Sequence, residues 1–140
     1  MQAADIEALV DLALALWPDH GRGEMAAELA LLLRTEDAAI FGWQEGSRWE
    51  AFAQCQLRHD YVEGCETSPV GYLEGIYVRE HLRGKGVAKA LLAECQDWAR
   101  EQGCREFASD CELSNEDSLR FHLAAGFREA GRIICFIKQL

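Results

Sequence analysis

Apolar side chains recur at the three- and four-residue spacing of an amphipathic helix near the start of the chain. These positions are Ile6, Leu9, Val10, Ala13, Leu16 and Trp17. Pro18 ends the pattern, because proline lacks a backbone donor and clashes with the preceding turn. A second stripe predicts another helix beside the first; it consists of Met25, Leu29, Leu32 and Leu33.

Alternation with a period of two predicts strands in the middle of the chain. Residues 38–44 and 49–58 are expected to form a hairpin, followed by a loop that contains three acidic residues. A further strand is expected over residues 72–78. One face of it should carry Tyr72, Glu74, Ile76 and Val78, and the other Leu73, Gly75 and Tyr77.

A glycine-rich loop follows that strand and opens a helix expected to end near Gly103. The backbone of the loop can approach a ligand closely. The loop also provides unpaired N–H groups, a helix dipole and two cationic side chains. An anionic group is expected there, with a pyrophosphate as the leading candidate. The loop lacks the third glycine of a dinucleotide-binding fingerprint and is not a P-loop. Taken alone, it also fits a basic turn without a ligand. The loop residues are Arg83, Gly84, Lys85, Gly86, Val87 and Ala88.

The rest of the chain predicts a short strand at 106–109, a helix from about Asn115 to Ala125, and a final strand. Residues 132–138 alternate apolar side chains on both faces, which is typical of a strand buried on both sides. We expect one domain over residues 1–140, because this length supports a single core.

The formal charge of −10 argues against nucleic acid as a partner and favours polycations, although an acidic surface also simply aids solubility. No apolar run is long enough for a membrane span, and the first residues are acidic where a signal peptide is basic. A cytoplasmic protein with no membrane partner is expected. The six cysteines lack metal-site spacing, so no metal is expected and the thiols should be reduced. Cys55, Cys95 and Cys135 are predicted to face the core.

The loop resembles the acetyl-CoA loop of the GCN5-related N-acetyltransferases, [QR]-x-x-G-x-[GA], in Arg83-x-x-Gly86-x-Ala88. The segment from Asn115 to Phe127 resembles a second element of that family, with His122 where the family has tyrosine. Residues 58–70, 73–78 and 106–110, together with Leu16-Trp17-Pro18, narrow the resemblance to the aminoglycoside 6'-N-acetyltransferases.

The resemblance implies an α/β fold: a mixed, mostly antiparallel sheet that splays between two central parallel strands and is flanked by helices. The strand that usually precedes the first helix is short or absent here. Acetyl-CoA is the expected co-substrate, with backbone N–H groups near Ile76 and Val78 binding the thioester, and Asn115 binding the pantetheine arm. An aminoglycoside is the expected acceptor, which would confer antibiotic resistance, and such enzymes are often homodimers.

Direct attack of an amine on the thioester requires a base for the amine and a stabilised or protonated thiolate. Glu74 is the first candidate base and Asp110 the second. His122 is a candidate acid for the thiolate, but the residue also fits a helix position that faces water, and a thiolate can leave without an acid because thiols are already fairly acidic. The side chains expected around the aminoglycoside are Trp17, His20, Asp60, Tyr61, Glu74, Asp110 and Glu112, with Asp19 and Glu66 less strongly indicated.

Two other functions remain open at this point. The acceptor could be another amine, such as a polyamine or a protein terminus, although the acidic loop suits a small polycation. Alternatively, the protein could bind acetyl-CoA without turnover, in which case the acceptor carboxylates would have no role.

Overall fold

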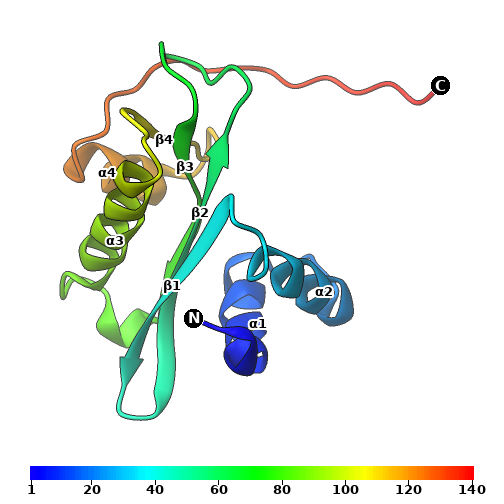
Figure 1. The fold of residues 1–140 in the computed structure, drawn as a ribbon, viewed down its shortest axis with the longest axis vertical. Helices are drawn as coiled ribbons and strands as arrows, with labels where there is room; N and C mark the ends of the chain where they lie inside the picture. Colours follow the sequence, from blue (N-terminus) through cyan, green and yellow to red (C-terminus); the bar gives the residue numbers. More distant parts are fainter.

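The computed structural model describes all of residues 1–140 and contains four helices and four strands, apart from two short 3-10 turns (Figure 1). In chain order they are α1 (Ile6–Leu16), α2 (Arg22–Leu32), β1 (Ala38–Glu45), β2 (Arg48–Arg58), β3 (Val70–Val78), α3 (Val87–Glu101), β4 (Phe107–Ser109) and α4 (Glu116–Ala124). The helices and the first four strands predicted from periodicity are therefore confirmed.

The strands form one sheet in the order β1-β2-β3-β4. The first three are antiparallel, whereas β3 and β4 are parallel and pair only from Gly71↔Phe107 to Leu73↔Ser109. Helices α1 and α2 lie on one side of the sheet, and α3 and α4 on the other (Figure 1). The expected α/β class and its splayed parallel pair are confirmed, but the pair lies at the edge of the sheet and not at its centre as expected.

Each face of the sheet has its own apolar core. On the α3 face, small residues of β2 (Ala51, Ala53 and Cys55) pack with Leu91 and Cys95 of the helix, and all five are at least 98% buried. On the α1 face the buried residues are Leu9, Val10, Leu12, Ala13, Met25, Leu29, Ile40 and Phe52. Cys55 and Cys95 are thus buried, as predicted.

A β-bulge in β3 overturns the predicted distribution of its side chains. Gln54 pairs with Gly75 and Cys55 pairs with Leu73, so Glu74 is an extra residue with no partner on β2. An extra residue reverses the alternation beyond it. Leu73, Ile76 and Val78 therefore all pack on the α3 face, and Tyr72 does not share a face with Ile76 and Val78 as expected.

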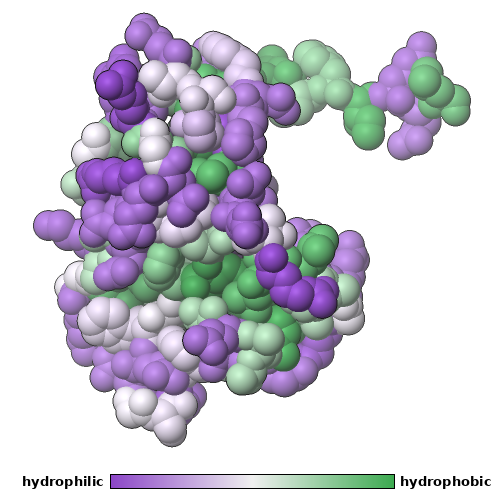
Figure 2. Space-filling model, in the orientation of Figure 1, coloured by the Kyte–Doolittle hydropathy of each residue, from purple (hydrophilic) through white to green (hydrophobic).

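The predicted final strand is not formed. Residues 128–140 have no secondary structure. Ala130 lies against Gly64 of the loop between β2 and β3, and residues 131–140 extend away from the sheet as an uncovered tail (Figures 1 and 2). Cys135 is exposed instead of facing the core, and the side chains of Ile134 and Phe136 are 81% and 90% exposed. Alternation gives a segment strand character, but a strand also needs a neighbour to pair with, and residues 132–138 pair with no strand of the sheet.

No strand precedes α1, in line with the short start expected from the sequence. A 3-10 turn at Ala3–Asp5 leads into the helix, and the Met1 amino group donates to the Ile40 carbonyl oxygen at 2.9 Å. Trp49 Nε1 donates to Asp5 Oδ1 at 3.1 Å, which ties this turn to the hairpin. None of the helices is both long and apolar enough to cross a membrane.

Candidate active site

The loop before α3 presents backbone donors to open space. Gly84 and Gly86 have φ angles of 75° and 84°, a left-handed conformation that favours glycine. Gly86 is the N-cap of α3, and the Ala90 N–H makes the helix's bond to Gly86 O at 3.0 Å. The N–H groups of Val87 and Ala88 precede that bond and have no intrahelical acceptor. Nothing lies within 4 Å of a Cβ built at Gly84 or Gly86, so this loop fits an approaching phosphate.

Arg83 ties this loop to the end of β3. Its Nε donates to the Val78 carbonyl oxygen at 2.8 Å, and its guanidinium lies 5.6 Å from the centre of the Tyr77 ring. Lys85 is exposed at the tip of the loop. The loop therefore carries two cationic side chains, one anchored and one exposed, and both favour the binding of an anion.

The two parallel strands part directly after Leu73 and Ser109. From Glu74 to Val78, the edge of β3 that faced β4 has no strand partner. Ile76 and Val78 lie on this stretch, where free backbone groups can pair with the amides of an extended ligand. The gap fits the pantetheine arm of acetyl-CoA, and the glycine loop fits its pyrophosphate.

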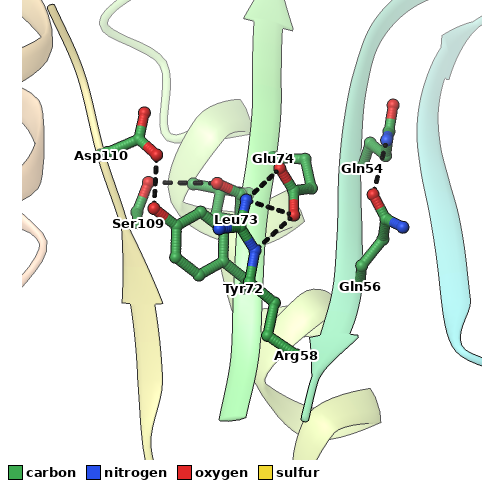
Figure 3. A network of polar contacts seen from close by, with 8 residues as sticks. All are labelled: Gln54, Gln56, Arg58, Tyr72, Leu73, Glu74, Ser109 and Asp110. Carbon is green, nitrogen blue, oxygen red and sulfur yellow. Dashed lines mark hydrogen bonds and ion pairs between the residues drawn. The ribbon is translucent and has the colours of Figure 1, made fainter. Parts of the chain in front are cut away.

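Glu74, the bulged residue, is held by Arg58 of β2. Arg58 donates from Nε and Nη2 to Oε1 at 3.0 and 2.9 Å, and from Nη2 to Oε2 at 2.9 Å (Figure 3). Burial raises the pKa of Glu74, Arg58 lowers it and Asp110 raises it, so that the net shift is upward. A half-buried carboxylate with a raised pKa is suited to accepting a proton near neutral pH.

A cavity of about 170 Å³ opens beside Glu74 on the α1 and α2 side of the sheet. Trp17 forms one wall: a Cβ built at Gly75 would lie 2.5 Å from its ring, so only glycine permits this approach. Trp17 also packs edge-to-face on Phe52 at 6.1 Å, and so belongs both to the core and to the cavity. The lining residues are Trp17, His20, Met25, Glu28, Leu29, Gln54, Gln56 and Glu74.

Asp110 lies at the end of β4 and accepts a hydrogen bond from the Tyr72 hydroxyl (Figure 3). The Arg58 guanidinium stacks over the same ring, 3.5 Å from its centre. Burial and the bond to Asp110 hold the pKa of Tyr72 well above its usual range, so the phenol remains a donor at neutral pH. Asp110 and Glu74 are thus linked through Tyr72 and Arg58.

The loop between β2 and β3 keeps its predicted site residues apart from this cavity. Asp60 is exposed, and the side chain of Tyr61 is 78% exposed, with its hydroxyl 3.4 Å from Glu63 Oε2. Glu112, which follows β4, is also exposed. Glu106 fixes the loop, because its Oε1 accepts bonds from the backbone N–H groups of Glu66 and Thr67 at 2.9 and 2.8 Å.

Two residues predicted to contact acetyl-CoA lie on or before α4. Asn115 Oδ1 accepts the Ser118 N–H at 3.1 Å and is the N-cap of the helix. Both ring nitrogens of His122 have partners within the protein. Nδ1 lies 2.7 Å from the Ser118 carbonyl oxygen, and Nε2 lies 2.8 Å from Ser109 Oγ.

Comparison with known proteins identifies the family of the chain. The sequence profile of the Acetyltransferase (GNAT) family matches residues 6–127. The chain belongs to this family. The aminoglycoside N(6')-acetyltransferase type 1 of Serratia marcescens is 42% identical over 137 residues, which cover 97% of this chain and 94% of that protein. The resemblance to that group, expected from separate sequence blocks, is confirmed.

Solved structures of GNAT acetyltransferases show the same fold. AAC(6')-Iy in complex with the bisubstrate analog CoA-S-monomethyl-acetylneamine is 38% identical, with a TM-score of 0.95 over 100% of this chain and 95% of that one. The apo 6'-N-acetyltransferase AAC(6')-IG of Acinetobacter haemolyticus is 34% identical, with a TM-score of 0.96 over 100% of this chain and 96% of that one.

The candidate site includes residues that sequence reasoning missed. Arg58 binds Glu74, and Tyr72 binds Asp110. Glu28 and Gln54 line the cavity. One signal was visible: Gln54 lies on the same face of β2 as Phe52, and a polar side chain directly beside a core aromatic residue suggests a site. Gly75 within a strand pattern was a second signal, since such a glycine often marks a bulge or a close approach.

Proposed function

We propose that this protein transfers an acetyl group from acetyl-CoA to the 6'-amino group of aminoglycosides and thereby confers resistance to them. The observation that carries this proposal is the position of Glu74. It lies on an unpaired bulge between a strand edge suited to a thioester and a cavity lined by further polar side chains. The names of the similar proteins support the choice of acceptor.

Acetyl-CoA is assigned to the loop and the open edge of β3. The N–H groups of Val87 and Ala88 and the charges of Arg83 and Lys85 bind the phosphates, together with the backbone of Gly84 and Gly86. The backbone near Ile76 and Val78 orients the thioester, and Asn115 adds a polar contact to the pantetheine arm while capping α4. Polarising the carbonyl oxygen in this way favours the tetrahedral transition state.

The acceptor is assigned to the cavity beside Glu74. Glu74 takes a proton from the 6'-ammonium, which frees the amine to attack the thioester carbonyl, and Trp17 and His20 pack against the sugar. Asp110 supplies a second negative charge, and Asp60, Tyr61 and Glu112 contact the outer rings of a larger aminoglycoside. A carboxylate about 4 Å from an ammonium gains on the order of 4 kcal/mol at an effective dielectric near 20, before desolvation.

The test is a thiol-release assay with acetyl-CoA and a panel of amines. The panel contains kanamycin, tobramycin, a 6'-hydroxyl aminoglycoside, spermidine and a basic peptide. Turnover is expected only with the 6'-amino compounds. In Glu74→Gln, kcat/KM should fall roughly 10²-fold, the usual contribution of a general base. Glu101→Gln, an exposed carboxylate change at the end of α3, is the matched control and should behave like wild type.

Each of the other results identifies a different function. Turnover with spermidine or peptide, and none with the drugs, would replace the acceptor while leaving acetyl transfer in place. Tight binding of acetyl-CoA without turnover on any amine would indicate a binding module and contradict the proposal.

We further propose that the protein is a homodimer in which the tail of each copy covers the other. The tail is residues 131–140; fully extended, it spans roughly 30 Å, which is enough to reach a neighbouring molecule. Its exposed apolar side chains are Ile133, Ile134, Phe136, Ile137 and Leu140. Strand β4 has β3 as its only neighbour, so its other edge is open to a strand. Leu113 and Leu123 offer exposed apolar surface just before and on α4, which follows that strand.

Light scattering coupled to size-exclusion chromatography tests the dimer. Wild type should elute with twice the 15.7 kDa mass of one chain. Ile134→Asp with Phe136→Asp should give a monomer, whereas Gln139→Asp, a polar change in the same tail, should not. A wild-type protein that stays monomeric at micromolar concentration would refute the exchange of tails.

We also propose that the protein works in the cytoplasm. All six cysteines are free thiols, three of them buried, which fits a reducing compartment that also supplies acetyl-CoA. Fractionation of cells that express the untagged protein tests this location.

A further inference from the structure

A chain of three hydrogen bonds joins α4, β4 and β3 where the parallel strands part. His122 Nδ1 lies 2.7 Å from the Ser118 carbonyl oxygen, and Nε2 lies 2.8 Å from Ser109 Oγ. Ser109 Oγ in turn donates to the Leu73 carbonyl oxygen at 3.2 Å (Figure 3). The chain therefore ends at the residue directly before Glu74.

The positions of the protons in this chain follow from its acceptors. A carbonyl oxygen can only accept, so Nδ1 carries a proton toward Ser118. Ser109 has one hydroxyl proton and faces two acceptors when His122 is neutral, Nε2 and the Leu73 oxygen. All three bonds are made at once only when Nε2 is also protonated and donates to Ser109. An imidazolium at this position would therefore satisfy every partner in the chain.

Ser109, and not the imidazole, is the member of this chain at the gap. It is the last residue of β4 paired with β3, and its hydroxyl bridges the two strands where they diverge. The His122 ring packs edge-to-face between Phe121 and Phe127, with centroids at 5.6 and 5.1 Å, and both of its nitrogens are occupied. A leaving group in the gap would meet the serine hydroxyl first.

We propose that Ser109 is the proton donor to the departing thiolate and that His122 recharges it. This inference rests on the proposed acetyl transfer. As the carbon–sulfur bond breaks, Ser109 gives its hydroxyl proton to the sulfur and takes the proton of Nε2. His122 becomes neutral, Ser109 is restored, and free thiol is formed. Solvent then returns a proton to the imidazole.

Single-turnover kinetics with kanamycin and saturating acetyl-CoA test the relay. Ser109→Ala and His122→Gln should each slow the chemical step by 10- to 100-fold while leaving the KM for acetyl-CoA unchanged. The double variant should be no slower than either single one, because the two residues act as a unit. Ser109→Thr keeps a hydroxyl and should retain most of the rate. Ser114→Ala, an exposed serine before α4, is the matched control.

The solvent isotope effect adds a readout that a purely structural role would not change. Wild type should be slower in D2O. Ser109→Ala should lose the part of the isotope effect that comes from proton transfer to sulfur, because in this variant the CoA thiolate leaves unprotonated. A rate and an isotope effect equal to those of Ser114→Ala would overturn the relay. So would a slow His122→Gln beside a normal Ser109→Ala, since the imidazole would then act without the serine.

Nitrogen chemical shifts of the His122 ring test the arrangement without any turnover. The neutral ring should carry its proton on Nδ1, the rarer tautomer, because of the bond to Ser118. The Nε2 signal should move in Ser109→Ala. A ring protonated on Nε2 in its neutral form would overturn the relay even if acetyl transfer is observed, whereas absence of transfer with the Nδ1 tautomer present would point to failure of the proposed function.

Discussion

The two ends of the unpaired stretch of β3 are built in different ways. At its carboxyl end, the loop from Arg83 to Ala88 relies on backbone: two left-handed glycines and the free N–H groups of a helix start. At its amino end, Glu74 relies on side chains, because Arg58 and Trp17 come from other elements and meet around a bulge. Backbone sites are encoded locally, whereas side-chain sites depend on distant packing. We call the loop the donor end, because acetyl-CoA is assigned to it, and the surroundings of Glu74 the acceptor end. The donor end should tolerate substitutions in distant elements that impair the acceptor end.

The largest effect is expected at Gly75. In Gly75→Ala, the new Cβ would lie 2.5 Å from the Trp17 ring, and such overpacking typically costs about 1–3 kcal/mol. The melting temperature should fall by several degrees and the KM for aminoglycoside should rise, while the KM for acetyl-CoA stays the same. Differential scanning fluorimetry and steady-state kinetics measure both.

A second substitution at Trp17 checks the cause. Trp17→Leu removes the ring that the new Cβ would touch, so the pair should be less destabilised than the sum of the single changes. If the two losses of stability simply add, the contact across Gly75 does not govern this end of the strand.

A smaller effect, confined to the donor end, is expected at Gly86. Its φ of 84° costs a residue with a side chain about 1–2 kcal/mol. Gly86→Ala should raise the KM for acetyl-CoA by roughly 10-fold, with little change in the KM for aminoglycoside. Gly86→Asn should be milder, because asparagine adopts this conformation more readily. Equal losses for both substrates would mean that the two ends are not independent.

The smallest effect concerns the pH dependence set by Arg58. Burial raises the pKa of Glu74 and Arg58 opposes that rise, so Arg58→Gln should move the pKa further upward. Activity requires the carboxylate and is lost as the pH falls through that pKa. The acid limb of kcat/KM should therefore shift to higher pH, with a several-fold loss of activity on the acid side of the profile and little change on the alkaline side.

Arg58→Lys keeps the positive charge beside Glu74 but lacks the guanidinium geometry, so it separates the two contributions. It should keep the acid limb close to the wild-type position. An acid limb that does not move in Arg58→Gln would show that Glu74 is not the group whose ionisation limits activity.

Much of the fold follows from periodicity, because helices and hairpins are decided by neighbours in the sequence. The stripe from Ile6 to Trp17 and the alternation around Phe52 were sufficient to place α1 and β2. The donor loop was also predictable, since Gly84 and Gly86 are needed for its backbone. Alternation did not reveal the bulge, because an extra residue becomes visible only when β3 is paired with β2.

The tail shows that a strand pattern in the sequence does not by itself produce a strand. Ile133 to Ile137 have the composition of a buried strand, yet within one chain they meet neither a pairing edge nor a covering helix. Arg58 was missed for a related reason: its partner Glu74 is 16 residues away, on a neighbouring strand. Contacts of this kind are set by register, and no local spacing records them.

The bulge also bears on how this protein can evolve. Without Glu74, Leu73 and Ile76 would be separated by a single residue and would still both face α3, as in a regular strand. The proposed catalytic carboxylate is therefore an insertion into a sheet that could close without it. Core packing and acceptor choice are carried by different positions, so selection can alter the residue on the bulge, and with it the range of drugs modified, without rebuilding the hydrophobic core.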